Sequence, residues 1–173
     1  MNDTELEKAI RDIQDFPKKG VIFKDITPLL GNPELFAKTI KAMSEPFKNA
    51  GITKVLGSES RGFILAAPIA MELGAGFVPV RKKGKLPYKV ISAEYALEYG
   101  TDTIEIHEDA LLPVEKILIV DDVLATGGTA AAMIELAEKL GAKIEGISML
   151  IELKFLDGRK KTGDKKVFSL LQY

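Results

Sequence analysis

Strand-like and helix-like segments alternate along the chain from Lys54 onward. The pattern predicts short buried strands at residues 54–56, 77–80, 117–120, 147–151 and 167–171. It predicts helices at residues 63–73 and 129–140. The second helix has apolar residues at i, i+3, i+4 and i+7 from Met133 and a glycine just beyond its end. This alternation predicts an α/β fold with an open parallel sheet that is flanked by helices on both faces.

One region departs from the alternation. Between Arg81 and Pro113 the apolar residues recur with period two, which predicts an antiparallel hairpin with its turn at residues 100–102. We expect this hairpin to project from the sheet and to be entered through the basic loop at residues 81–85. The length of 173 residues indicates one domain.

The N-terminal region is predicted to be helical in two places. Thr4 and Glu7 fit a capping box, and Leu6, Ile10 and Ile13 would give this first helix an apolar stripe that ends before Pro17. Asn32 would cap a second helix that begins at Pro33, with an apolar face formed by Phe36, Ile40, Met43 and Phe47.

Charge and composition exclude several classes of protein. The formal net charge is −1, so no global positive field favours nucleic acid or an anionic membrane surface. The chain has no cysteine, which excludes disulfides, thiolate zinc sites and a cysteine nucleophile. The charged first ten residues do not fit a signal peptide, and no apolar run is long enough to span a bilayer. We therefore expect a cytoplasmic protein without membrane or nucleic-acid partners.

The segment from Ile117 to Thr129 carries the most specific chemistry. A buried strand ends in Asp121 and Asp122, and a turn of small residues then opens a helix. Backbone N–H groups in a glycine-rich turn at a helix N-terminus form an anion site. Two acids beside a phosphate site make sense if they accept hydrogen bonds from ribose hydroxyls. Taken singly, these pieces are an ordinary strand end, turn and helix cap, and only their full order is specific.

Two further polar loops follow strands of the same predicted sheet. One contains Glu59, Ser60 and Arg61, and the other runs through the basic residues 81–85. Because ligands bind beyond the carboxyl ends of parallel strands, we expect all three loops to meet at one edge. A phosphate nest, two acids and several cations match a sugar with a monophosphate at one end and a pyrophosphate at the other.

The strand–acid–glycine segment resembles the 5-phosphoribosyl-1-pyrophosphate (PRPP) motif of the type I phosphoribosyltransferases. Three more segments resemble the adenine phosphoribosyltransferase family in that family's order. Residues 20–30 resemble its base-binding hood, residues 59–63 its pyrophosphate loop, and residues 81–87 with 95–100 its flexible catalytic loop. The resemblance implies the type I phosphoribosyltransferase fold, with a helix and hood over residues 1–35 and a flexible catalytic hairpin over residues 81–107.

The resemblance also implies the reaction and its partners. The family transfers the phosphoribosyl group of PRPP to adenine, giving AMP and pyrophosphate. It uses Mg²⁺ held mainly through PRPP and water, without a set of protein ligands, and acts as a cytoplasmic homodimer. Another purine, namely hypoxanthine, guanine or xanthine, stays open as acceptor. A PRPP-sensing regulator is the alternative of another class, but it would be expected to carry a DNA-binding domain or a basic face.

Residue roles follow from the resemblance alone. Glu98 would accept the purine proton, and a cis peptide between Glu59 and Ser60 would turn backbone N–H groups toward pyrophosphate. Lys24 stands where the family commonly has arginine, which leaves open whether this position acts through its backbone or its side chain. The expected substrate-binding residues are Ile22, Phe23 and Lys24 for the base, Glu59, Ser60, Arg61, Arg81, Lys82 and Lys85 for pyrophosphate, Tyr99 in the catalytic loop, Asp121 and Asp122 for ribose, and Ala125, Thr126, Gly127, Gly128 and Thr129 for the 5′-phosphate.

Overall fold

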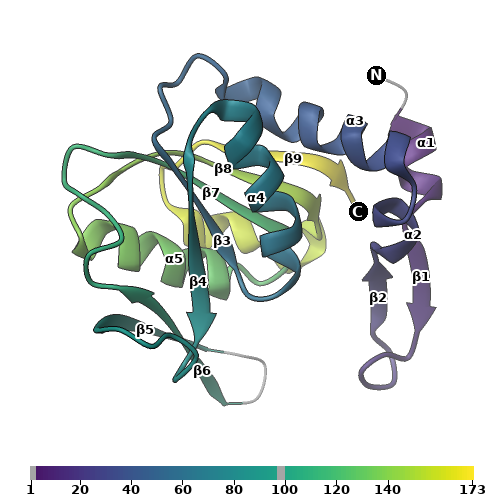
Figure 1. Ribbon diagram of the computed structural model, residues 1–173. Coiled ribbons are helices and arrows are strands. Elements are labelled where there is room, and N and C mark those ends of the chain that lie inside the picture. The colour runs from purple at the N-terminus through teal and green to yellow at the C-terminus, as the bar shows by residue number, and fades with distance from the viewer. Residues whose placement is uncertain (1–2, 97–99) are drawn as a thin grey trace. The chain divides into compact units, whose positions relative to one another are not determined.

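The computed structural model describes residues 3–96 and 100–173 and divides the chain into two compact units, residues 1–41 and 42–173 (Figure 1). The smaller unit contains helix α1 (Asp3–Lys8), strands β1 (Arg11–Gln14) and β2 (Ile22–Asp25), helix α2 (Thr27–Leu30) and the beginning of helix α3 (Pro33–Ser44). Strands β1 and β2 pair antiparallel as a two-stranded ribbon.

The predicted first helix is wrong beyond Lys8. Residues 11–14 form β1, in which Ile13 lies opposite Phe23 of β2. The spacing of Ile10 and Ile13 fits one face of a helix, but cross-strand pairing with a distant segment decides the local structure. The second predicted helix is confirmed as α3, which is followed by the 3₁₀ turn η1 (Glu45–Phe47).

A seven-stranded sheet organises the larger unit, in the order β5-β6-β4-β3-β7-β8-β9. Its parallel part consists of β4 (Gly76–Lys82), β3 (Lys54–Ser58), β7 (Lys116–Leu124), β8 (Lys143–Glu152) and β9 (Val167–Gln172). The predicted open parallel sheet is thus confirmed. The chain moves outward from β3 to β4 in one direction and from β7 to β8 in the other, so β3 and β7 flank the point where the strand order reverses.

Two helices connect the parallel strands. Helix α4 (Arg61–Leu73) joins β3 to β4, and α5 (Gly128–Lys139) joins β7 to β8. Because the two right-handed crossovers run in opposite directions, they place α4 and α5 on opposite faces of the sheet. The inner strand residues Leu118, Ile119 and Val120 are completely buried. These apolar runs therefore form the core that fixes the strand ends and the loops after them.

The predicted hairpin is confirmed as β5 (Val90–Ala96) and β6 (Thr101–His107), which pair antiparallel from Val90↔His107 to Ala96↔Thr101. The predicted turn at residues 100–102 is wrong at residues 101 and 102, which are strand residues paired with β5. Strand β6 also pairs antiparallel with the end of β4, through Arg81↔Glu105 and Lys82↔Ile104. The hairpin therefore continues the sheet at its edge while it extends away from the parallel strands (Figure 1). Lys139 of α5 donates to the Ser92 carbonyl of β5 at 3.0 Å.

After β8, the 3₁₀ turns η2 (Lys154–Leu156) and η3 (Gly158–Thr162) lead into β9. Within residues 3–96 and 100–173, no helix has the length and apolar character needed to cross a membrane.

Candidate functional site

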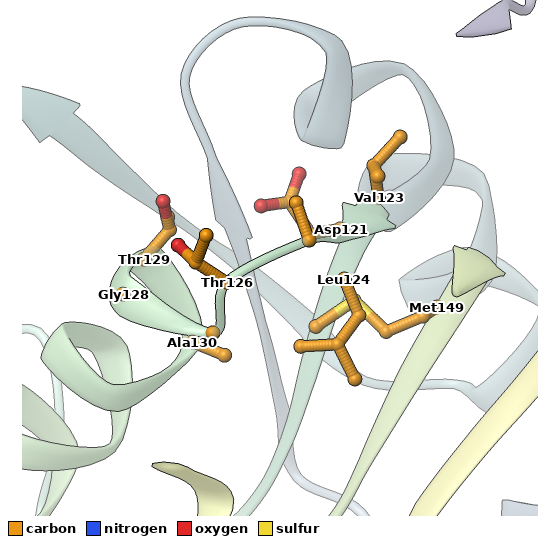
Figure 2. Close-up of a pocket in the computed structure, with 10 residues that line it drawn as sticks. Asp121, Val123, Leu124, Thr126, Gly128, Thr129, Ala130 and Met149 are labelled. Atoms are coloured by element: carbon orange, nitrogen blue, oxygen red, sulfur yellow. The ribbon is translucent and has the colours of Figure 1, made fainter. Parts of the chain in front are cut away.

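A pocket lies where β7 ends and α5 begins (Figure 2). The end of β7, the turn and the first residues of α5 line it, together with Met149 of β8. The turn residues named by the sequence, Ala125 to Thr129, all contribute to the lining. Figure 2 shows the Thr126 and Thr129 hydroxyls and the Asp121 carboxylate around this pocket. The structure thus brings the predicted phosphate loop and one predicted ribose acid together.

Close backbone packing shapes the phosphate loop. Gly127 has φ +78°, and a Cβ atom placed there would collide with the carbonyl oxygen of Gly158 in η3. A Cβ atom on Gly158 would in turn collide with the Ala125 carbonyl and lie 3.0 Å from the Gly127 nitrogen. Gly127 is therefore required by its positive φ and by the neighbouring chain, in addition to any ligand. Sequence reasoning missed Gly158, because nothing near it in the sequence suggests this contact.

Asp121 is held in a tight buried environment. Its side chain accepts a hydrogen bond from the Asp122 backbone N–H at 2.9 Å, and the residue is 7% exposed. A Cβ atom on Gly62, in the first turn of α4, would lie 2.6 Å from Asp121 Oδ1. Burial raises the pKa of Asp121 well above its usual value, the charge of Asp122 adds to this, and a hydrogen bond from Ser58 opposes it.

Asp122 joins the acid pair to the next loop. Its Oδ2 atom lies 2.6 Å from Nε of Arg61, the first residue of α4. The peptide bond between Glu59 and Ser60, just before this helix, is cis, as the resemblance implied. The adjacent positions of β3 and β7 in the sheet explain why the ends of these two strands meet. The predicted pyrophosphate loop and ribose acids are thus in direct contact.

The basic loop after β4 is also connected to Glu59. Arg81 binds the Glu59 carboxylate through Nε at 3.1 Å and Nη2 at 3.3 Å, and the Lys82 backbone N–H donates to the same carboxylate at 3.1 Å. Burial of Glu59 raises its pKa, but hydrogen bonds from Lys82 and Arg81 outweigh this effect and leave the pKa below its usual value. Arg81 also donates to the Lys85 carbonyl at 3.2 Å.

A polar cluster joins the basic loop to the hairpin. The Lys82 ammonium lies 2.9 Å from Asp102 of β6, and the Tyr95 hydroxyl lies 3.2 Å from the same Asp102 oxygen. Burial is the main cause that raises the pKa of Tyr95, and the Thr129 side chain at the start of α5 opposes it. The sequence did not single out Tyr95 or Asp102 as site residues. The hairpin prediction placed Tyr95 in a strand but Asp102 in the turn, whereas Asp102 belongs to β6 and lies opposite Tyr95.

The predicted base-binding residues belong to the smaller unit. Ile22, Phe23 and Lys24 are consecutive in β2, where Phe23 makes an edge-on ring contact with Phe16 at 5.1 Å between centroids. The Lys24 ammonium lies 2.7 Å from the Asp12 carboxylate of β1. Ile22 and Lys24, two residues apart in a strand, direct their backbone groups to the same edge of the ribbon. The predicted catalytic Glu98 and Tyr99 lie outside the described residues.

The oxygen donors that the site offers to a metal ion are two adjacent carboxylates. In the part of the chain that the structure describes, no three His, Cys, Asp or Glu side chains gather as a metal-binding set. The site does offer the adjacent carboxylates of Asp121 and Asp122 beside the phosphate pocket. Mg²⁺ commonly keeps several waters and takes one or two carboxylates together with substrate phosphates.

Comparison with known proteins identifies relatives over nearly the whole chain. Residues 25–172 match the phosphoribosyl transferase domain family. The chain is 57% identical to the adenine phosphoribosyltransferase of Carboxydothermus hydrogenoformans over 169 residues, which cover 98% of this chain and 99% of that protein.

Solved structures extend the similarity to the fold. The crystal structure of adenine phosphoribosyltransferase from Rhodothermus marinus matches with a TM-score of 0.95 and 55% identity, covering 99% of this chain and 98% of that one. The Saccharomyces cerevisiae enzyme, complexed with adenine and an imino-altritol bisphosphate, matches with a TM-score of 0.92 and 43% identity over 98% of both chains. From its sequence, its fold and the loops gathered at the strand ends, the chain belongs to the adenine phosphoribosyltransferase family.

Proposed function

We propose that this protein transfers the phosphoribosyl group of PRPP to adenine and releases AMP and pyrophosphate. The observation that carries the proposal is the joining of three loops. Asp121 lines the pocket after β7, and its neighbour Asp122 contacts Arg61. Glu59, in the same loop as Arg61, contacts Arg81. This arrangement offers a neutral nest, two acids and several cations in the order in which PRPP presents phosphate, ribose and pyrophosphate.

The phosphate loop, residues 125–129, would bind the 5′-phosphate through backbone N–H groups and the hydroxyls of Thr126 and Thr129. Asp121 and Asp122 would accept hydrogen bonds from the ribose hydroxyls. The backbone around Ser60, with the side chains of Arg61, Arg81, Lys82 and Lys85, would surround the pyrophosphate. Glu59 holds Arg81 and the Lys82 backbone in place, so we assign it to orienting these donors.

Base recognition is assigned to the smaller unit as a hood. Phe23 would stack on the purine while the backbone groups of Ile22 and Lys24 read its edge. The ion pair of Lys24 with Asp12 supports this backbone role, because it gives the ammonium a partner within the ribbon. On this assignment the two units act together as one phosphoribosyltransferase domain.

In the reaction, the purine nitrogen attacks the anomeric carbon of the ribose as the bond from that carbon to pyrophosphate breaks. Pyrophosphate leaves with the bonding electron pair, and the proton on the purine nitrogen must be accepted by a base. We assign this proton to the Glu98 carboxylate on the family resemblance. Mg²⁺, when bound, neutralises pyrophosphate charge, and the cationic side chains of the site act in the same direction. We further propose a cytoplasmic homodimer.

The test is a direct assay with the full chain. Protein, Mg²⁺ and PRPP are mixed with adenine, hypoxanthine, guanine or xanthine in turn, and nucleotide and pyrophosphate are both measured. We expect stoichiometric AMP and pyrophosphate with adenine and loss of turnover after EDTA treatment, restored by added Mg²⁺. Nucleotide formation with another purine but not with adenine would overturn the assignment of the base. Binding of PRPP without transfer to any purine would overturn the assignment as an enzyme.

A further inference from the structure

An ion pair between a buried carboxylate and a half-exposed guanidinium lies behind the phosphate loop. Glu152, the last residue of β8, is 5% exposed. Arg159 of η3 donates to both of its carboxylate oxygens, from Nε to Oε1 at 2.6 Å and from Nη2 to Oε2 at 2.7 Å. Two parallel bonds of this kind fix the relative orientation of the guanidinium and the carboxylate. The hydrogen bonds from Arg159 lower the pKa of Glu152, so the pair stays ionised at neutral pH.

The same guanidinium also binds the neighbouring strand. Arg159 Nη1 donates to the Val167 carbonyl at 3.1 Å, and Nη2 lies 3.3 Å from the Ser169 hydroxyl. Both residues belong to β9. Arg159 therefore ties η3 to the ends of two sheet strands with one rigid group.

Gly158 is the residue of η3 that contacts the phosphate loop. This glycine packs so closely on the phosphate loop that a Cβ atom there would collide with the Ala125 carbonyl. The contact is reciprocal, because a Cβ atom on Gly127 would collide with the Gly158 carbonyl. Densely packed backbones transmit a displacement because there is no space to absorb it. The position of Gly158 thus limits the positions that the loop can take.

Arg159 and Glu152 themselves do not line the pocket. We propose that they are positioning residues for the 5′-phosphate of PRPP, which act through Gly158 to hold residues 125–128 in the conformation that binds the phosphate. This inference rests on the proposed function, since it assigns the loop to the 5′-phosphate. It predicts that loss of the ion pair weakens PRPP binding but leaves adenine binding and the chemical step nearly unchanged. The reason is that the assigned base site and proton acceptor lie on other segments of the chain.

Three substitutions test the proposal. Arg159→Lys keeps the charge but loses the two-pronged contact with Glu152. Glu152→Gln keeps the shape but removes the charge that binds Arg159. Gly158→Ala leaves the ion pair intact and displaces the loop directly. Lys160→Ala is the matched control, because Lys160 is in the same turn, its side chain is 76% exposed, and its ion pair is with the exposed Asp157.

We expect each test variant to raise the KM for PRPP and the Kd for ribose 5-phosphate about tenfold or more, because small misplacements of binding groups are costly. The KM for adenine should stay within about twofold and kcat within about threefold of wild type. Backbone amide shifts of residues 125–128 should move in all three variants and stay unchanged in Lys160→Ala. Urea unfolding at the assay temperature identifies the folded variants, and Gly158→Ala remains informative if loss of the ion pair prevents folding.

Wild-type affinity for ribose 5-phosphate in these variants would overturn the proposal. So would an equal loss of affinity for PRPP and adenine, because that is the signature of general destabilisation. If the wild-type protein bound ribose 5-phosphate but made no AMP, the proposed function would fail while the binding measurements still tested the role of Arg159 and Glu152.

Discussion

Replacing Asp122 with asparagine probes the contact that joins two loops of the site. Asp122 Oδ2 lies 2.6 Å from Arg61 Nε, with the side chains 10% and 33% exposed. Asparagine keeps the shape of the side chain but loses its charge. On the proposed assignment the Asp122 carboxylate also accepts a hydrogen bond from a ribose hydroxyl. A hydrogen bond to a charged group contributes about 1.5–3 kcal/mol, and we take about 1.5–2 kcal/mol because the asparagine oxygen still accepts.

That free energy corresponds to about a 10- to 30-fold loss in kcat/KM for PRPP. The assay is the initial rate of AMP formation as PRPP is varied at saturating adenine, with urea unfolding measured in parallel. Asp164→Asn is the matched control, because that side chain is 93% exposed and lies 3.4 Å from Lys165. Unchanged PRPP kinetics in a folded Asp122→Asn protein would refute the assigned role of this acid.

Four further predictions test other parts of the molecule. Gly62→Ala should lower the free energy of unfolding by about 1–3 kcal/mol in urea titrations, because its Cβ atom would lie 2.6 Å from Asp121 Oδ1; wild-type stability would contradict the close packing. Hydrogen bonds from Thr27 lower the pKa of Asp25 to about 2 from 3.8, so the stabilisation it provides is fully present above about pH 4 and is lost as the pH falls through about 2. The stability difference between wild type and Asp25→Asn should therefore shrink between pH 5 and pH 2.5, and a constant difference would argue against this. Glu98→Gln should lower the single-turnover rate about 10²–10⁴-fold with PRPP binding nearly intact, and a wild-type rate would show that another group accepts the proton. Amide exchange across residues 82–100 should slow when PRPP is added, and equal rates with and without PRPP would count against a closing loop.

The architecture of the larger unit could be predicted because its strands are buried on both faces. Residues such as Leu118 and Ile119 form continuous apolar runs, and a run of that kind bounded by a glycine-rich turn has few alternatives to an inner parallel strand. The same reasoning failed at Ile13. Its spacing from Ile10 fits a helix, while the pairing partner that makes it a strand, Phe23, lies ten residues further along the chain.

The site could be predicted only where its chemistry is local in sequence. The turn from Asp121 to Thr129 is one continuous segment, and its pocket is lined largely by that segment. Gly158 and Arg159, which support the phosphate loop from behind, lie between β8 and β9. Their backbone and ion-pair contacts leave no periodic pattern in the sequence, so they could not be predicted. The role of Glu59 was equally hidden, because an acid in a predicted pyrophosphate loop makes physical sense only once Arg81 is seen beside it.

Three cationic side chains of the site already have carboxylate partners within the protein, and this pairing affects the affinity for substrate. Arg61 contacts Asp122, Arg81 contacts Glu59, and Lys82 contacts Asp102. On the proposed assignment, these carboxylates compete with pyrophosphate oxygens for the same donors. Binding then exchanges one set of ion pairs for another, and its free energy is the difference between the two sets. The substrate should therefore raise the melting temperature less than the number of its charged contacts suggests.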